Sequence, residues 1–164
     1  LFLFAQRSKI NKKMVRIRLA LEEDKKTIAR FQQEMAKETE NIELDNDVLI
    51  SGVTAVFRDP AKGKYLVAED DKQIVGSMLL TPEWSDWRDK WVLWLQSVYV
   101  LPEFRRKNIF SLMYEFAKQI AKRDEDVAGM RLYVDNSNEK AIQVYKAIGM
   151  NGDHYRVFEW MKKE

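Results

Sequence analysis

Cysteine is absent from this chain of 164 residues, and histidine occurs only once, as His154. The lack of cysteine excludes a disulfide framework, a thiol nucleophile and a cysteine-based zinc site. A single histidine also argues against a histidine metal cluster and against a catalytic triad. We therefore expect no metal, and a reaction that is carried by other side chains or by the backbone.

Long apolar runs and a strong charge excess are missing as well. The N-terminal sequence LFLFA is followed by a polar, basic stretch, so its apolar run is too short for a signal peptide or a membrane-spanning helix. The net charge is only +2 and the basic residues are dispersed, so no nucleic-acid-binding surface is predicted. We expect a cytoplasmic protein with no nucleic-acid partner and no membrane partner.

The residues that are present are typical of one globular domain. Hydrophobic residues make up 46% of the sequence and charged residues 33%, and no internal repeat, low-complexity segment or linker is evident. We expect a single domain over residues 14–164. Residues 1–13 then form an N-terminal extension of unknown role.

Apolar periodicity predicts an α/β fold. The expected strands lie at 14–20, 64–69, 73–80, 91–100, 129–135 and about 154–161. The expected helices open at Glu23 or Asp24, span about 46–58 and 108–122, and run from near Ser137 to Gly149. The Lys and Glu runs within 22–40 and 117–126 are interpreted as solvated helix faces.

The connections between these elements predict a mixed sheet. Residues 64–80 are expected to form an antiparallel hairpin, with a polar loop after it over 81–90. The connection from strand 91–100 to strand 129–135 is long enough, with its helix, to make these strands parallel and adjacent. The result is a mixed α/β sheet with helices on both faces.

An anion site is predicted where strand 91–100 ends. The strand runs into Pro102 and then into a cationic loop, RRKN, over residues 105–108. The helix that follows begins with unpaired backbone N–H groups and carries the positive end of its dipole there. This pattern suits a phosphate group, although a basic turn before a helix is often only solvated.

A second motif lies in the segment RLYVDNSNEKAIQVYKAIGM, residues 131–150. It reads as a short strand, a polar turn and a helix that ends at Gly149. Asn138, Ala141 and Tyr145 fall on one face of this helix. A small residue between an amide and a phenol leaves a groove in which an extended ligand can lie.

The two motifs together, in this order and spacing, resemble the GNAT superfamily of N-acetyltransferases over about residues 14–161. The resemblance implies the GNAT-like acyl-CoA N-acyltransferase fold, a mixed and mostly antiparallel central sheet with helices on both faces. In that fold two splayed parallel strands admit the cofactor. The resemblance also implies acetyl-CoA as the acetyl donor.

The resemblance implies a cofactor-binding set drawn from the strand end, the cationic loop and the two helix starts. Its members are Val98, Tyr99, Val100, Arg105, Arg106, Lys107, Asn108, Ile109, Phe110, Ser111, Asn138, Ala141 and Tyr145. The family usually has glycine, or alanine at the second position, where this chain has Asn108 and Phe110. Asn is the least costly replacement where φ must be positive, and Phe110 is expected to point toward the core.

Catalysis in such a site needs an acid, a polarised carbonyl and a base. The resemblance implies that Tyr145 protonates the leaving thiolate, and a phenol pKa of about 10 keeps it protonated at neutral pH. The alternative is that Tyr145 is an amphipathic core residue. A backbone N–H around Val98 to Val100 is expected to polarise the carbonyl. No base is evident, and Glu83 and Asp86 are candidates that act directly or through water.

The acceptor is expected to contact the tryptophan-rich segment that begins at residue 81. Trp84 and Trp87 alternate there with carboxylates, and Gln96 follows on the next strand. Aromatic faces and carboxylates suit a cationic amine. The alternative is a packed hairpin cap or a dimer surface, and a homodimer is one expectation for this chain.

Three functions remain open at this point. The leading one is an acetyl-CoA-dependent N-acetyltransferase acting on a primary amine of a small molecule, by direct attack in a ternary complex. The second is a peptide or protein N-acetyltransferase, and the third is a catalytically silent acyl-CoA-binding or interaction module. Neither GxGxxG nor GxxxxGK[ST] occurs, which argues against nicotinamide and nucleoside triphosphate enzymes.

Overall fold

A computed structural model describes residues 15–162, in which five strands form one sheet. The strands are β1 (Arg16–Leu19), β2 (Lys64–Asp70), β3 (Gln73–Ser85), β4 (Lys90–Val100) and β5 (Val127–Arg131). The α-helices are α1 (Lys25–Glu40), α2 (Asn46–Arg58), α3 (Ile109–Arg123) and α4 (Glu139–Ala147). The strands lie in sequence order, antiparallel except for the parallel pair of β4 and β5. The predicted mixed sheet is confirmed.

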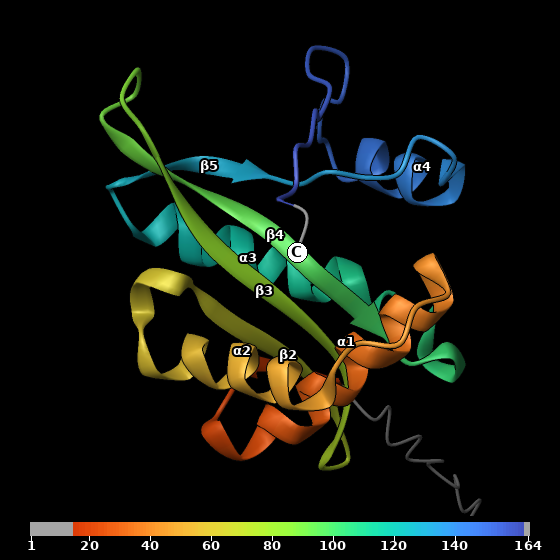
Figure 1. The fold of residues 1–164 in the computed structure, drawn as a ribbon. Coiled ribbons are helices and arrows are strands. Elements are labelled where there is room, and N and C mark those ends of the chain that lie inside the picture. The colour runs from red at the N-terminus through yellow and green to blue at the C-terminus, as the bar shows by residue number, and fades with distance from the viewer. Residues whose placement is uncertain (1–14, 163–164) are drawn as a thin grey trace, which may run out of the picture.

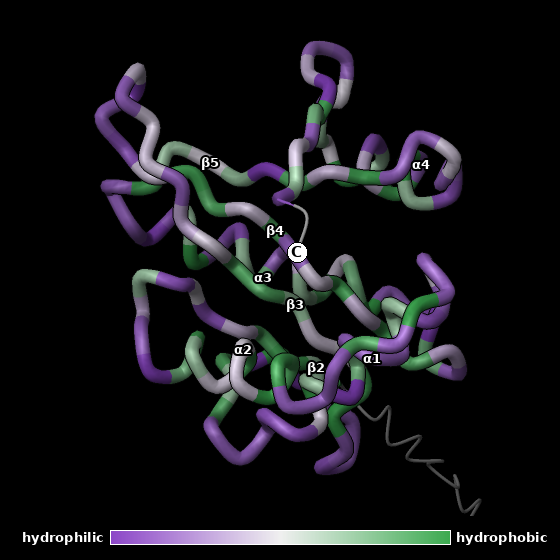
Figure 2. Tube along the Cα trace, viewed as in Figure 1, coloured by the Kyte–Doolittle hydropathy of each residue, from purple (hydrophilic) through white to green (hydrophobic). Residues whose placement is uncertain are grey.

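Helices cover both faces of this sheet, as predicted (Figure 1). α1 and α2 lie on one face, and α3 lies on the other. Figure 2 shows apolar residues concentrated along the central strands, between the helices. The buried faces follow helical periodicity, with Ile109, Met113 and Ala117 on α3 and Ile28 and Phe31 on α1. No helix within residues 15–162 is long and apolar enough to cross a membrane.

A partly buried ionic network fixes the start of α1 against the sheet. Arg18 on β1 donates to Asp24 from Nη1 at 2.7 Å and to Glu69 on β2 from Nε at 2.8 Å. The Leu21 N–H also donates to Asp24. Burial alone raises the pKa of Asp24, but these hydrogen bonds outweigh it and hold that pKa below its usual value. The network ties β1 and β2 to the helix that later contributes to the site.

The polar loop predicted over 81–90 is wrong, because most of it belongs to strands. β3 continues to Ser85 and β4 begins at Lys90, so the turn is only residues 86–89. Pro82 and the charged neighbours favoured a loop. β2 pairs with β3 only as far as Leu80, however, so Pro82 lies where β3 has one strand neighbour. A missing N–H is tolerated at such an edge.

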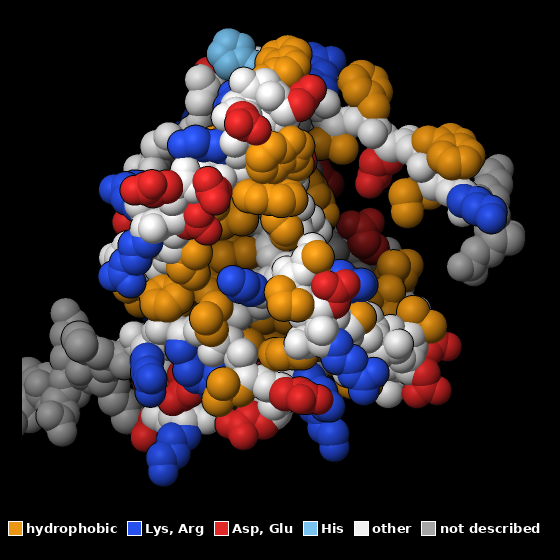
Figure 3. Space-filling view, turned by 90° about the vertical axis from the view of Figure 1, so that its left-hand side faces the viewer, with side chains coloured by type: hydrophobic (Ala, Val, Ile, Leu, Met, Phe, Trp, Pro, Cys, Tyr) orange, Lys and Arg blue, Asp and Glu red, His pale blue; other side chains and the backbone are white. Residues whose placement is uncertain are grey.

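The ends of the chain also differ from expectation. β5 stops at Arg131, and residues 151–162 form no helix or strand, so the predicted strand at 154–161 is wrong. A strand needs a neighbouring backbone to bond with, and this segment leaves the body instead, with Tyr155, Phe158 and Trp160 exposed (Figure 3). The predicted extension 1–13 and the first residue of the strand predicted at 14–20 lie outside the described residues.

Candidate acyl-CoA site

A bulge interrupts β4 three residues before its end. Gln96 pairs with Leu79 on β3 and Tyr99 pairs with Ser77, so two residues of β4 oppose one residue of β3. Ser97, the first of the two, has a φ of 48°. A bulge leaves the extra residue unpaired and locally disrupts the ladder. Backbone groups next to Val98 therefore lack the regular ladder partners of β3, although the sequence itself contains no signal for the bulge.

The parallel strands separate just before this bulge. The pairing of β4 with β5 ends at Trp94 and Arg131, whereas β4 continues to Val100. Beyond Arg131 the chain runs to α4 without further strand structure (Figure 1). The bulged end of β4 therefore lacks a β5 neighbour, which is the splayed arrangement that the family resemblance implied.

The cationic loop after β4 adopts a conformation that ordinary residues avoid. Arg106 has a φ of 61° and Asn108 a φ of 62°. Asn108 thus occupies the left-handed region expected at the position of the family's glycine. The first hydrogen bond of α3 runs from the Leu112 N–H to the Asn108 carbonyl at 3.0 Å. The N–H groups of residues 109–111 precede that bond, so they have no carbonyl partner within the helix.

Close packing against the sheet sets the position of the α3 N-terminus. A Cβ on Gly76 would lie 3.0 Å from the Tyr99 carbonyl oxygen and 3.3 Å from Cγ2 of Ile109. Ile109 itself is buried. Glycine on β3 therefore lets the first turn of α3 approach the end of β4.

The aromatic ring that replaces a loop glycine points away from the anion site. Phe110 packs against the core, and its ring centroid lies 5.4 Å from that of Tyr145 on α4 in an edge-on contact. This contact brings the predicted acid beside the first turn of α3. Burial raises the pKa of Tyr145 above its ordinary value of 10.0. The phenol therefore stays protonated throughout the neutral range.

Asn138 caps α4 with its side chain. Its Oδ1 accepts a hydrogen bond from the Ala141 N–H at 3.1 Å. The amide N–H₂ group of Asn138 has no hydrogen-bond partner within residues 15–162, so it remains available to a ligand. Ala141 and Tyr145 follow on the same face of the helix.

The sequence model of the acetyltransferase (GNAT) family matches residues 19–150, most of the described chain. This chain belongs to the GNAT acetyltransferase family. A solved protein from Clostridium difficile 630, described as a possible acetyltransferase, is 43% identical over 92% of this chain and 99% of that one, with a TM-score of 0.84.

Two more distant structures share the GNAT fold. An acetyltransferase of Trypanosoma brucei is 17% identical, with a TM-score of 0.70 over 90% of this chain and 100% of that one. The structure of AAC(6')-Iy in complex with the bisubstrate analogue CoA-S-monomethyl-acetylneamine is 14% identical. It covers 92% of this chain and 99% of that one, with a TM-score of 0.75.

Carboxylates from α1 reach the bulged end of β4 in this GNAT protein. The Tyr99 hydroxyl lies 2.9 Å from Oε2 of Glu34 and 3.0 Å from Oε1 of Glu38. Burial raises the pKa of Tyr99, and the two carboxylates raise it further. These positions are solvent-accessible, as predicted for 22–40, but their carboxylates also bond to Tyr99. Their spacing of four residues was the available signal, but it is common on surface helices.

The two predicted carboxylate bases lie away from the bulge. Glu83 accepts a hydrogen bond from Arg131 Nη1 at 2.6 Å and another from the Trp94 indole N–H. It pairs with Val92, which lies about 16 Å along β4 from Ser97 at roughly 3.3 Å per residue. Asp86 lies in the turn of the hairpin, farther still. Neither touches the bulge directly.

The tryptophans of the hairpin are divided between its two faces. Trp84 packs edge-on against Trp91, with ring centroids 5.0 Å apart. Trp87 lies in the turn and is 89% exposed. Trp94 and Gln96 belong to the opposite face, where Gln96 Nε2 donates to Thr81 Oγ1 at 2.6 Å. The predicted acceptor residues therefore do not form one wall.

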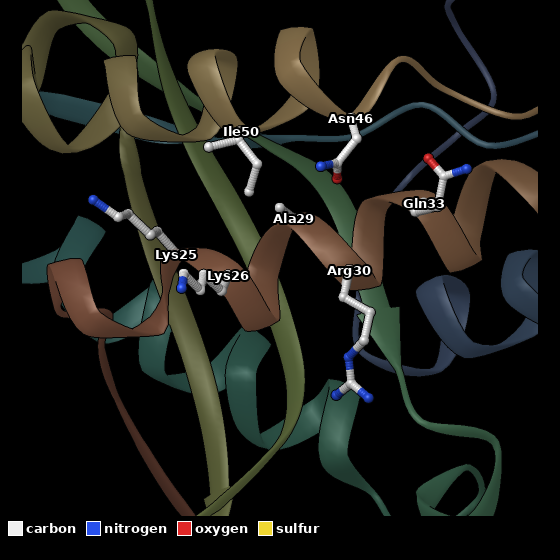
Figure 4. Close-up of a pocket in the computed structure, with 7 residues that line it drawn as sticks. All are labelled: Lys25, Lys26, Ala29, Arg30, Gln33, Asn46 and Ile50. Carbon is white, nitrogen blue, oxygen red and sulfur yellow. The ribbon is translucent and has the colours of Figure 1, made fainter.

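An open hollow of about 460 Å³ lies between α1 and α2, away from the acyl-CoA site (Figure 4). Ile50 and Asn46 of α2 point into it toward Ala29, whereas the charged end of Arg30 points away from α2. None of the residues that line it belongs to β4, the cationic loop, α3 or α4.

Proposed function

We propose that this GNAT protein transfers an acetyl group from acetyl-CoA to a primary amine of a small molecule, by direct attack in a ternary complex. One observation carries the proposal. Three features lie together where β4 and β5 have separated. They are the bulge of β4, the left-handed cationic loop and the contact of Tyr145 with the first turn of α3.

The cofactor-binding residues in this proposal act mainly through their backbones. The first-turn N–H groups of Ile109, Phe110 and Ser111 face the pyrophosphate, with the positive end of the α3 dipole behind them. The bulged strand from Val98 to Val100 runs beside the pantetheine arm. The amide N–H₂ of Asn138 donates to the same arm, while its oxygen stays in the helix cap.

The acetyl transfer itself needs one bond to form and one to break. The neutral amine nitrogen attacks the thioester carbon, a backbone N–H near Val98 stabilises the developing oxyanion, and the carbon–sulfur bond breaks. Tyr145 gives its phenolic proton to the leaving thiolate. The nitrogen loses one proton to a base, and Tyr145 regains a proton from solvent.

The attacking nitrogen must lose its proton to a base. Both Glu83 oxygens accept hydrogen bonds, and Asp86 lies at the far end of the hairpin. Neither carboxylate can remove a proton directly at the bulge. If either acts as the base, as predicted, it does so by proton relay through water.

A small-molecule acceptor is supported by likeness to a solved structure. The AAC(6')-Iy structure contains an analogue that joins CoA to acetylneamine, and it shares the fold of this chain. A peptide or protein acceptor is the second candidate in the same class. A cytoplasmic location and a homodimer stay predictions.

A silent acyl-CoA-binding module is the alternative from another class. The observation that favoured it was the loss of the loop glycines at Asn108 and Phe110. Asn108 has a left-handed φ and the ring of Phe110 points inward, so neither side chain has to block the loop. The loss of the glycines is therefore weaker support for a silent module.

Release of free thiol from acetyl-CoA tests the proposal. The full chain is incubated with acetyl-CoA and a panel of amines that includes aminoglycosides, polyamines and lysine-containing peptides. We expect thiol release that depends on a small amine. Release only with peptides would support the second candidate, and binding of acetyl-CoA without release on any amine would support the silent module.

A further inference from the structure

The three cations of the loop are engaged in different ways. Arg105 donates from Nε to the Val100 carbonyl at 2.9 Å and from Nη2 to Oε2 of Glu38 at 2.6 Å. Its guanidinium also lies 5.5 Å from the centre of the Tyr99 ring. Arg105 is thus bound to β4 and α1 at once.

Glu38 on α1 joins Arg105 of the loop to Tyr99 of β4. Its Oε2 accepts from Arg105, while its Oε1 lies 3.0 Å from the Tyr99 hydroxyl. Tyr99 is only 4% exposed and is fixed in the sheet beside the bulge. One carboxylate of α1 therefore holds the first residue of the loop against the bulged strand.

The other two cations do not share this bridge. Lys107 Nζ lies 4.7 Å from the centre of the Phe104 ring. Arg106 has a φ of 61° and makes no hydrogen bond or ion pair within residues 15–162. Of the three loop cations, Arg106 is therefore the one whose charge is least compensated by other side chains.

We propose that Glu38 is a positioning residue, which orders the loop through Arg105, and that Arg106 supplies the side-chain charge for the cofactor phosphates. Arg105 then serves as a brace and not as a phosphate ligand. This inference rests on the proposed function, because it assumes that the loop binds acetyl-CoA.

The exposure of the Arg105–Glu38 ion pair allows a positioning role to be distinguished from a contribution to global stability. The side chains of Arg105 and Glu38 are 44% and 41% exposed. Ion pairs as exposed as this one contribute little to global stability. Loss of Glu38 should therefore change ligand binding while the thermal midpoint of unfolding hardly moves.

Glu34 offers a matched control. It lies one helical turn before Glu38 and also contacts the Tyr99 hydroxyl, but it makes no contact with Arg105. We would titrate acetyl-CoA into the full-length Glu38→Ala, Glu38→Gln and Glu34→Ala proteins by calorimetry. We expect about fivefold weaker binding for Glu38→Ala, the upper end of what an exposed ion pair contributes.

The other variants sharpen the test. Glu38→Gln keeps an acceptor oxygen and should recover part of the loss, and Glu34→Ala should stay within about twofold of wild type. The KM for acetyl-CoA should follow the Kd, with kcat at saturation nearly unchanged. Arg106→Ala should weaken binding and reduce its dependence on salt, because it removes an exposed charge from the phosphate site.

Two results would overturn the inference. One is equal binding by the Glu38→Ala and Glu34→Ala proteins. The other is a salt dependence that survives Arg106→Ala but is lost in Arg105→Ala, since the phosphate ligand would then be Arg105. Failure of the wild-type protein to bind acetyl-CoA would instead contradict the proposed function itself.

Discussion

At the scale of single residues, Tyr145 is the position on which catalysis depends most. Tyr145→Phe removes one hydroxyl and keeps the ring against Phe110. We expect kcat to fall by roughly 10²-fold or more, the usual contribution of a general acid, with unchanged affinity for acetyl-CoA. Steady-state kinetics and calorimetry on the same protein measure the two quantities.

The pH profile of the wild-type enzyme belongs to the same prediction. Burial raises the pKa of Tyr145 above 10.0, so the acid form is fully populated at lower pH and is lost only above that value. We expect no fall in kcat from this group between pH 7 and 9. Tyr114→Phe is the control, because Tyr114 also contacts the Phe110 ring, at 6.2 Å. Equal turnover by Tyr145→Phe and wild type would rule out the acid role.

Residue-scale predictions from sequence succeeded where backbone chemistry is local. Asn108 was expected at a positive φ because Asn tolerates the left-handed region better than other residues with a side chain, and its φ is 62°. Glu38 was missed because its role depends on Arg105 and Tyr99, which lie 67 and 61 positions away in the chain. Periodicity within α1 contains no information about such partners.

At the scale of elements, the β3–β4 hairpin offers the test of acceptor binding. If the hairpin contacts a cationic acceptor, Trp84→Ala and Trp87→Ala should each raise the acceptor KM by about 2- to 30-fold, the range of a cation–π contact. Only Trp84→Ala should lower the thermal midpoint, because Trp84 packs on Trp91 whereas Trp87 is exposed.

Trp160→Ala is the control for that experiment. Trp160 is as exposed as Trp87 but lies in the C-terminal segment and not in the hairpin. If both hairpin variants have the acceptor KM of the wild type, the hairpin is not part of the acceptor site. The alternatives are then a packed hairpin cap or a dimer surface.

The hairpin also shows the limit of reading elements from sequence. Helix 46–58 and strand 91–100 were predicted almost to the residue, because the helix has a clear apolar period and the strand is an apolar run that ends before Pro102. The 81–90 segment was predicted as a loop because it contains proline and charge. Its strand character comes from pairing with β4, which continues the ladder to Ser85 and Lys90.

At the scale of the whole molecule, the topology was predictable and the exposed end of the chain was not. The long crossover between β4 and β5 required a parallel pair, and the sheet has that pair as its one parallel step. A sixth strand was predicted at about 154–161. In the structure these residues have no strand neighbour, and pairing with a neighbour is a property that no local pattern specifies.

The proposed function depends on one whole-molecule property, which is the binding of acetyl-CoA at the separated ends of β4 and β5. Calorimetric titration of the full chain with acetyl-CoA measures it directly, with CoA and ATP as comparisons. We predict micromolar binding of acetyl-CoA, similar binding of CoA and much weaker binding of ATP. No detectable binding of acetyl-CoA at millimolar concentration would contradict the proposal, since the loop with Asn108 and Phe110 would then have lost its ligand.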